Sequence, residues 1–162
     1  MCISLIPMTK ELCRQYYKGF KRDPDIYMDM SLFKQFLYSD SWADAYFERQ
    51  RLKRRIFFAI MSKGEPIGEI ILKNIDEIAR KCTLSIHLQN DSVKGQGIGT
   101  KAERLALIYA FSELNMASVN ADAVIKNERS QHVLEKVGFH FLRQEGSFRY
   151  YHCTADSFYK FA

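Results

Sequence analysis

The sequence predicts an α/β (α+β) fold with a mixed, mostly antiparallel sheet of about six to seven strands and helices on both faces. Short segments with alternating or continuous apolar residues recur along the chain, which is typical of strands. Residues 98–114 carry apolar side chains at helical spacing on two sides, so this helix should be mostly buried. A strand is predicted on each side of it, at residues 82–89 and 119–124.

The first third of the chain predicts one strand followed by helices. We expect a strand, a helix, a loop and two further helical pieces, at residues 3–6, 10–18, 21–30, 31–37 and 41–51. Thr9 and Ser41 stand before helices, where a hydroxyl accepts a hydrogen bond from a free amide of the first turn. The loop contains a proline, three aspartates and little periodicity.

The rest of the chain predicts the remaining strands. Residues 55–61 are apolar on both faces, and a tight turn joins them to an antiparallel strand at residues 67–73. Residues 139–142 and 148–153 predict a final hairpin, before a short amphipathic tail at residues 154–162. Because the length suits one core and no internal repeat is present, we expect residues 1–162 to form a single domain.

A glycine-rich stretch lies between a predicted strand and the central helix. Gly95, Gly97 and Gly99 stand at alternate positions, where the missing Cβ atoms leave backbone amides accessible. The first turn of a helix adds unpaired N–H groups and a positive dipole end, so the stretch predicts a phosphate or pyrophosphate site. A P-loop and a dinucleotide fingerprint both require other spacings.

A second block follows one helix and one strand later. Asn127 suits the N-cap of a short helix, Ser130 lies in its first turn, and Gly138 suits its C-terminal end. The two blocks together resemble those of the GCN5-related N-acetyltransferases (GNAT), with Lys94 where that family usually has Gln or Arg. The resemblance covers residues 56–153 and is closest to the branch that acetylates ribosomal-protein N-termini and polyamines.

The resemblance implies an acetyl-CoA-dependent N-acetyltransferase that acts on a primary amine: a small amine, a polyamine or a protein N-terminus. It implies that the strands on either side of the central helix splay apart, and that the pantetheine arm lies in the notch between them. The expected cofactor-binding residues are Leu88, Val93, Lys94, Gly95, Gln96, Gly97, Ile98, Gly99, Thr100, Asn127 and Ser130. No metal is expected.

The resemblance also implies catalytic roles. Ser130 matches a serine that would hydrogen-bond the sulfur as the thiolate leaves. The polyamine branch has a tyrosine where this chain has Leu134, so Tyr150, Tyr151 and water remain alternative proton donors. Glu69 is the first candidate for the general base. It lies in the middle of an apolar strand, where burial of an unpaired carboxylate would cost folding free energy. His87, His132 and an ordered water remain alternatives.

The acceptor amine is expected to bind beside the loop after the first helix. Asp25, Tyr27 and Asp29 would suit a cationic amine there, although an acidic, solvated turn would have the same composition.

Charge and composition limit which other functions the sequence can support. The net charge is +5, and much of it lies in residues 49–55, which could bind nucleic acid but are more typical of a solvated helix end. The chain has no apolar run of the ~20 residues that a membrane span needs, and its cysteines are scattered. We expect no signal peptide and a cytoplasmic location. The oligomeric state is left open between a monomer and a homodimer. A succinyl-CoA donor, an inactive CoA-binding module and a basic-surface binding module remain alternatives.

Overall fold

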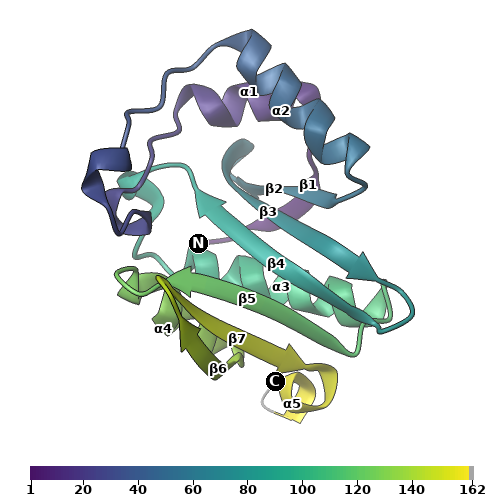
Figure 1. The fold of residues 1–162 in the computed structure, drawn as a ribbon. Coiled ribbons are helices and arrows are strands. Elements are labelled where there is room, and N and C mark those ends of the chain that lie inside the picture. The colour runs from purple at the N-terminus through teal and green to yellow at the C-terminus, as the bar shows by residue number, and fades with distance from the viewer. Residues whose placement is uncertain (161–162) are drawn as a thin grey trace.

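The computed structural model describes residues 1–160, so the last two residues of the expected domain and tail lie outside it. It contains a seven-stranded sheet in the order β1-β2-β3-β4-β5-β7-β6 (Figure 1). The strands are β1 (Ser4–Pro7), β2 (Ile56–Ser62), β3 (Glu65–Asp76), β4 (Lys81–Leu88), β5 (Ser118–Val124), β6 (His140–Glu145) and β7 (Phe148–Thr154). The helices are α1 (Lys10–Lys18), α2 (Asp40–Leu52), α3 (Ile98–Ser112), α4 (Glu128–Val137) and α5 (Ala155–Lys160), with 3-10 turns η1 (Pro24–Ile26), η2 (Met30–Leu32) and η3 (Asp91–Val93). The predicted fold class is confirmed.

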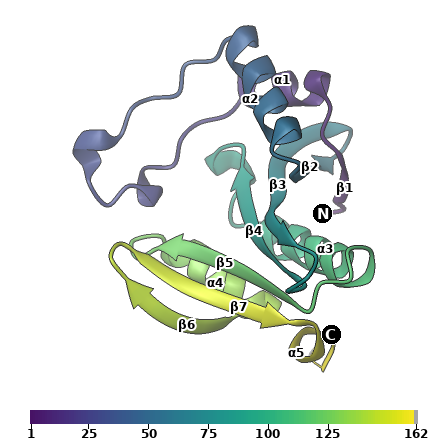
Figure 2. The same ribbon diagram turned by 45° about the vertical axis from the view of Figure 1, so that its right-hand side comes forward.

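The sheet is interrupted between β4 and β5. These two strands are parallel and pair only through Lys81↔Ser118, Cys82↔Val119 and Thr83↔Asn120, whereas the other neighbouring strands are antiparallel. Beyond these pairs β4 stays with β3 and β5 stays with β7, so the two halves of the sheet diverge (Figures 1 and 2). The expected splay is therefore present, and it leaves one edge of β4 without a strand partner.

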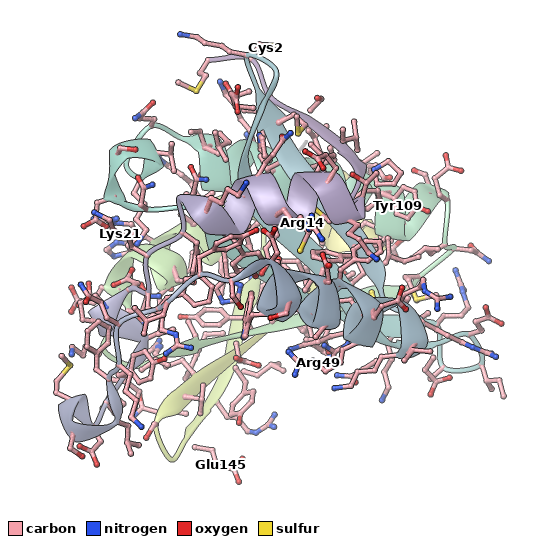
Figure 3. All side chains as sticks on the ribbon, turned by 90° about the horizontal axis from the view of Figure 1, so that it is seen from above. Cys2, Arg14, Lys21, Arg49, Tyr109 and Glu145 are labelled. Atoms are coloured by element: carbon pink, nitrogen blue, oxygen red, sulfur yellow. The ribbon has the colours of Figure 1, made fainter. Side chains whose placement is uncertain are left out.

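Two hydrophobic clusters cover the two faces of the sheet. The larger one packs α3 and α4 against the strands, with Leu84 and Ile86 of β4 on this side. The smaller one lies under α1 and α2 and includes Tyr16, Tyr17 and Ala59. Figure 3 shows α1 and α2 side by side above the sheet, with Arg14 on α1. The Arg14 guanidinium joins these helices by donating to both carboxylate oxygens of Asp44, at 2.8 and 2.6 Å.

Helix ends follow local sequence except around residues 31–41. Thr9 and Asn127 cap α1 and α4 as predicted, and Gly138 ends α4 with φ 119°. Helix α2 instead begins at Asp40, because the Ser39 hydroxyl, not that of Ser41, accepts the first-turn amide of Trp42. The predicted helix at residues 31–37 is reduced to η2.

The missing helix has a tertiary cause. Phe33 leaves η2 with extended backbone angles, and the segment then runs toward the α1–α2 cluster. There the Phe36 ring packs on Tyr17 and Trp42, with ring centroids 5.7 and 4.8 Å apart. Because burial of an aromatic ring outweighs the weak preference of a short segment for a helix, the connection stays extended.

Helix α3 is mostly buried, as its two apolar sides predict, but two positions differ from the apolar pattern. Ile98, Ala102, Leu107 and Phe111 are at most 7% exposed, whereas the apolar Leu105 is 38% exposed and the charged Glu103 only 1%. The buried stripe contains Ala102, Ala106 and Ala110, whose small side chains let the helix approach the strands closely. Periodicity alone predicts two apolar sides and cannot tell which of them meets the sheet.

Candidate functional site

The glycine-rich loop presents free amides at the head of α3. Gly95 and Gly97 have φ values of 73° and 76°, in the left-handed region that favours glycine, and Gly97 caps α3 without a side-chain hydrogen bond. Within the described chain, the amides of residues 95–100 donate to no protein acceptor, whereas those of Val93 and Lys94 bond to Asn90 and Asp91. Nothing lies within 4 Å of a Cβ built on Gly95 or Gly97, so the loop opens onto free space. These are the features that an anion site requires.

Lys94 braces this loop through its side chain. Its ammonium lies 2.7 Å from an Asp23 carboxylate oxygen and 3.3 Å from one of Asp91, and its side chain is only 11% exposed. Burial by itself would raise the pKa of Asp23, but the Lys94 hydrogen bond and the nearby Arg129 charge outweigh it and lower that pKa. The ionised Asp23 therefore ties the connection between α1 and α2 to the glycine loop.

Two cavities lie in the notch where β4 and β5 separate. The first, of about 120 Å³, lies beside the loop and is lined by Phe20, Lys21, Asp23, Ile26, Ile86, His87, Leu88, Lys94, Gly99, Glu103, Asn127, Arg129, Ser130 and Val133. The second, of about 260 Å³, lies between the strands and is lined by Ile26, Lys73, Thr83, Leu84, Ser85, Ile86, His87, Glu103, Ala121, Asp122, Ala123, Val124, Asn127, Ser130, Leu134 and Phe148. Shared lining residues from β4, α3 and α4 show that the two cavities adjoin.

The structure brings together most of the residues expected to bind the cofactor. Leu88, Lys94 and Gly99 line the first cavity, and Asn127 and Ser130 line both. Five further residues lie in the adjacent turn and the first turn of α3: Val93, Gly95, Gln96, Gly97 and Thr100. The side chain of Ile98 instead packs in the hydrophobic core, with 1% of the residue exposed. The Asn127 side-chain oxygen accepts the Ser130 amide at 3.2 Å, which leaves its NH₂ group able to bind a ligand.

Glu69 of β3 is buried beneath α1 and α2 and lines neither cavity. Its Oε1 accepts hydrogen bonds from the hydroxyls of Tyr17 and Tyr46 at 2.6 and 2.9 Å. Glu69 is 1% exposed, and its Oε2 has no partner among the described residues. Burial and the Glu69 charge raise the pKa of both tyrosines, so both hydroxyls stay protonated and act as donors.

His87 connects Glu69 to the notch. The two residues are register partners on β3 and β4, and His87 Nδ1 lies 3.4 Å from Glu69 Oε1. The His87 side chain is 44% exposed and lines both cavities. The exposed imidazole therefore lies beside a buried carboxylate, an arrangement that is compatible with a general base.

The loop between α1 and α2 reaches the notch with residues other than those expected. Ile26 lines both cavities, and Lys126 holds the loop by donating to the carbonyls of Pro24 and Tyr27 at 3.3 and 3.2 Å. Asp25, Tyr27 and Asp29 line neither cavity. The Asp29 carboxylate instead caps η2 by accepting the Ser31 amide.

Several residues that line the cavities were not predicted from the sequence. Leu134 stands at the second cavity with no hydroxyl, while Ser85, Asp122 and Lys73 bring polar groups to it. Glu103 was also missed, although an acidic residue in an apolar helical stripe is a readable signal.

Among residues 1–160 no group of three or more His, Cys, Asp or Glu could hold a metal ion. None of the helices in this range combines the length and apolar character that a membrane crossing demands.

Comparisons with known proteins agree with this geometry. A family model for the acetyltransferase (GNAT) domain matches residues 3–140. A putative ribosomal N-acetyltransferase, YdaF, of Bacillus subtilis (strain 168) is 35% identical over 80 residues, 49% of this chain and 43% of that protein. A spermidine N(1)-acetyltransferase of Escherichia coli (strain K12) is 29% identical over 82 residues, 51% and 44% of the two chains. The chain thus spans about half the length of the curated relatives it matches.

Solved structures share the fold over nearly the whole chain. A spermidine N-acetyltransferase from Vibrio cholerae, in complex with CoA and spermine, has a TM-score of 0.76 at 16% identity and covers 97% of this chain and 98% of its own. A probable acetyltransferase has a TM-score of 0.77 at 21% identity, covering 95% and 93%. Because the family model matches residues 3–140, which is most of the chain, the chain belongs to the GNAT acetyltransferase family.

Proposed function

We propose that this chain is an acetyl-CoA-dependent N-acetyltransferase acting on a primary amine. The observation that carries the proposal is the set of free amides at residues 95–100, which open onto a notch where β4 and β5 part. Arg129 and Lys21 add positive charge around the first cavity, which favours a ligand with several phosphates. The free thiols Cys13, Cys82 and Cys153 favour a reducing, cytoplasmic location.

The residues present fit the cofactor. The amides of residues 95–100 would bind the pyrophosphate, Asn127 and the unpaired edge of β4 would hold the pantetheine arm, and Ser130 would lie near the sulfur. Acetyl-CoA, when bound, supplies a thioester whose carbonyl carbon an amine can attack. The protein positions the two reactants, removes a proton from the amine and stabilises negative charge on the departing sulfur.

Proton removal is assigned to His87, with Glu69 as a positioning residue. With Nδ1 directed at Glu69, the imidazole is left with Nε2 as the acceptor of a proton from the amine. Once His87 is protonated, its charge pairs with the Glu69 carboxylate, which Tyr17 and Tyr46 hold in place. Glu69 thus contributes to catalysis by positioning His87, and it does not contact the amine.

The proposed acceptor is a primary amine. The relatives' names point to a protein N-terminus and to spermidine. Near the second cavity, the Asp122 carboxylate suits a cationic amine, while Lys73 lines the same space with the opposite charge. The notch therefore suits an amine that places one ammonium beside Asp122, and a small amine, a polyamine or a peptide N-terminus could each do so.

An amine panel tests the proposed function directly. The purified chain is mixed with acetyl-CoA and spermidine, a peptide with a free N-terminus, a small primary amine or an N-acetylated peptide as the control. We expect free thiol to appear with at least one free amine, and mass spectrometry to find one acetyl group on that amine. Binding of CoA without thiol release from any amine would instead indicate a CoA-binding module. Binding of nucleic acid that falls with salt and survives loop substitutions would indicate a basic-surface module.

Ser130→Ala should lower kcat by about 10–150-fold and leave the Kd for acetyl-CoA nearly unchanged, because a hydrogen bond to developing charge contributes about 1.5–3 kcal/mol. The serine hydroxyl lines both cavities, while its neighbour Asn127 would still hold the cofactor. Ser112→Ala, at the far end of α3, is the control and should behave as wild type. An unchanged kcat in Ser130→Ala would move the proton donor to Tyr150, Tyr151 or water.

A further inference from the structure

Glu103 is a buried carboxyl group without a partner. It lies on α3 one turn after Gly99, and only 1% of it is exposed. Neither of its oxygens has a hydrogen bond to another described residue, and Oε2 is fully buried. Glu69, the other buried glutamate, differs because two tyrosines donate to it.

Glu103 borders the notch. It lines both the first cavity, beside the glycine loop, and the second cavity, between the separated strands. The apolar side chains of Ile86, Ala123 and Leu134 line the second cavity with it, and only 1% of Glu103 is exposed. A polar group in such surroundings is stable only if something satisfies it, and the chain itself does not.

The charge state of Glu103 follows from this burial. Burial raises its pKa from 4.5 to about 8, so near neutral pH the group is a carboxylic acid with one O–H donor and one carbonyl acceptor. Other charged or titratable groups line the same cavities, but none of them hydrogen-bonds to Glu103: Lys21, Asp23, Lys73, His87, Lys94, Asp122 and Arg129. Lys94 and Asp23 are already paired with each other.

We propose that the buried carboxyl of Glu103 is a cofactor-binding group, which hydrogen-bonds an amide or thioester carbonyl of the acyl-CoA arm inside the notch. The inference rests on the proposed function, because it needs an acyl-CoA in this place. A carboxylic acid and an amide match each other, since each offers one donor and one acceptor. An arm bearing amides would thus satisfy a buried carboxyl group that no described residue hydrogen-bonds.

The proposal makes binding depend on pH in a defined direction. A carbonyl acceptor on the ligand favours the protonated form of Glu103, so its pKa is higher in the complex than in the free protein. Above the free-state value of about 8, binding must then take up a proton, and affinity falls as the pH rises. Below it, Glu103 is already protonated and contributes no pH dependence.

The test compares wild type, Glu103→Gln and Glu103→Leu by calorimetric titration with desulfo-CoA, which lacks a titrating thiol. Glutamine keeps a donor and an acceptor but cannot ionise, so Glu103→Gln should bind like wild type near neutral pH and lose the fall in affinity above a pH of about 8. Glu103→Leu should bind about tenfold more weakly at neutral pH, the loss expected for one hydrogen bond. Glu113→Gln, at the exposed C-terminal end of α3, should match wild type throughout.

Stability gives a second readout that separates binding from packing. A carboxyl with a raised pKa in the folded state destabilises the fold progressively as the pH rises from 4.5 to about 8. Without ligand, the melting temperature of wild type should therefore fall across this window relative to both variants.

Equal affinity for desulfo-CoA in Glu103→Leu and wild type, together with the same pH profile in wild type and Glu103→Gln, would overturn the cofactor contact. If wild type binds no desulfo-CoA at any pH, the proposed function and this inference both fail.

Discussion

Gly97→Trp should abolish the rise in melting temperature that acetyl-CoA gives the wild-type protein. A ligand at about 100 times its Kd stabilises a protein by about 2.7 kcal/mol, which a thermal-shift assay detects readily. Gly97 caps α3 with φ 76°, and a Cβ there points into open space in front of the free amides. An indole in this place would fill the space that a pyrophosphate needs, so the variant should show no shift at any concentration of acetyl-CoA.

The variant needs a control for backbone strain alone. A side chain at a left-handed position costs about 1–2 kcal/mol, which lowers the melting temperature of the free protein whatever its ligand. Gly64 has φ 78° and equally open surroundings, but it belongs to the turn between β2 and β3 and lines neither cavity. Gly64→Trp should lose similar stability yet keep the full acetyl-CoA shift. A normal shift in Gly97→Trp would refute the loop as the cofactor site.

His87→Ala should lower kcat/KM by about 10²–10⁴, the usual contribution of a positioned general base. Steady-state kinetics with the best amine of the panel measures this effect. His132 provides the matched control, since it lies on the exposed side of α4 and lines neither cavity, and His132→Ala should remain active.

Glu69→Gln separates positioning from proton transfer. The amide oxygen can still accept from Tyr17 and Tyr46, but a neutral side chain no longer stabilises a protonated His87. We expect a smaller loss of kcat than in His87→Ala, with KM for the amine nearly unchanged. Full activity in both His87→Ala and Glu69→Gln would leave an ordered water as the base.

Much of the cofactor half of the site could be read from short stretches of sequence. Glycines at alternate positions before a helix predict left-handed turns with open amides, and Gly95 and Gly97 have that conformation. Asn127 was predicted as an N-cap from its type and position, and it caps α4. These features depend on neighbours within one turn of the chain, so local pattern suffices to predict them. The two blocks together also sufficed to indicate the family.

The amine half of the site depended on contacts between distant segments. His87 and Glu69 form a pair only because β3 and β4 align in one register, and residues 31–37 are extended only because Phe36 packs on α1 and α2. Sequence spacing cannot report such pairings, since each is decided by which face of a strand or helix is buried. The same holds for Glu103, whose burial follows from the rotation of α3 against the sheet. Local conformational preferences thus determined the phosphate loop and the caps, while strand register and packing decided which acids and bases meet in the notch.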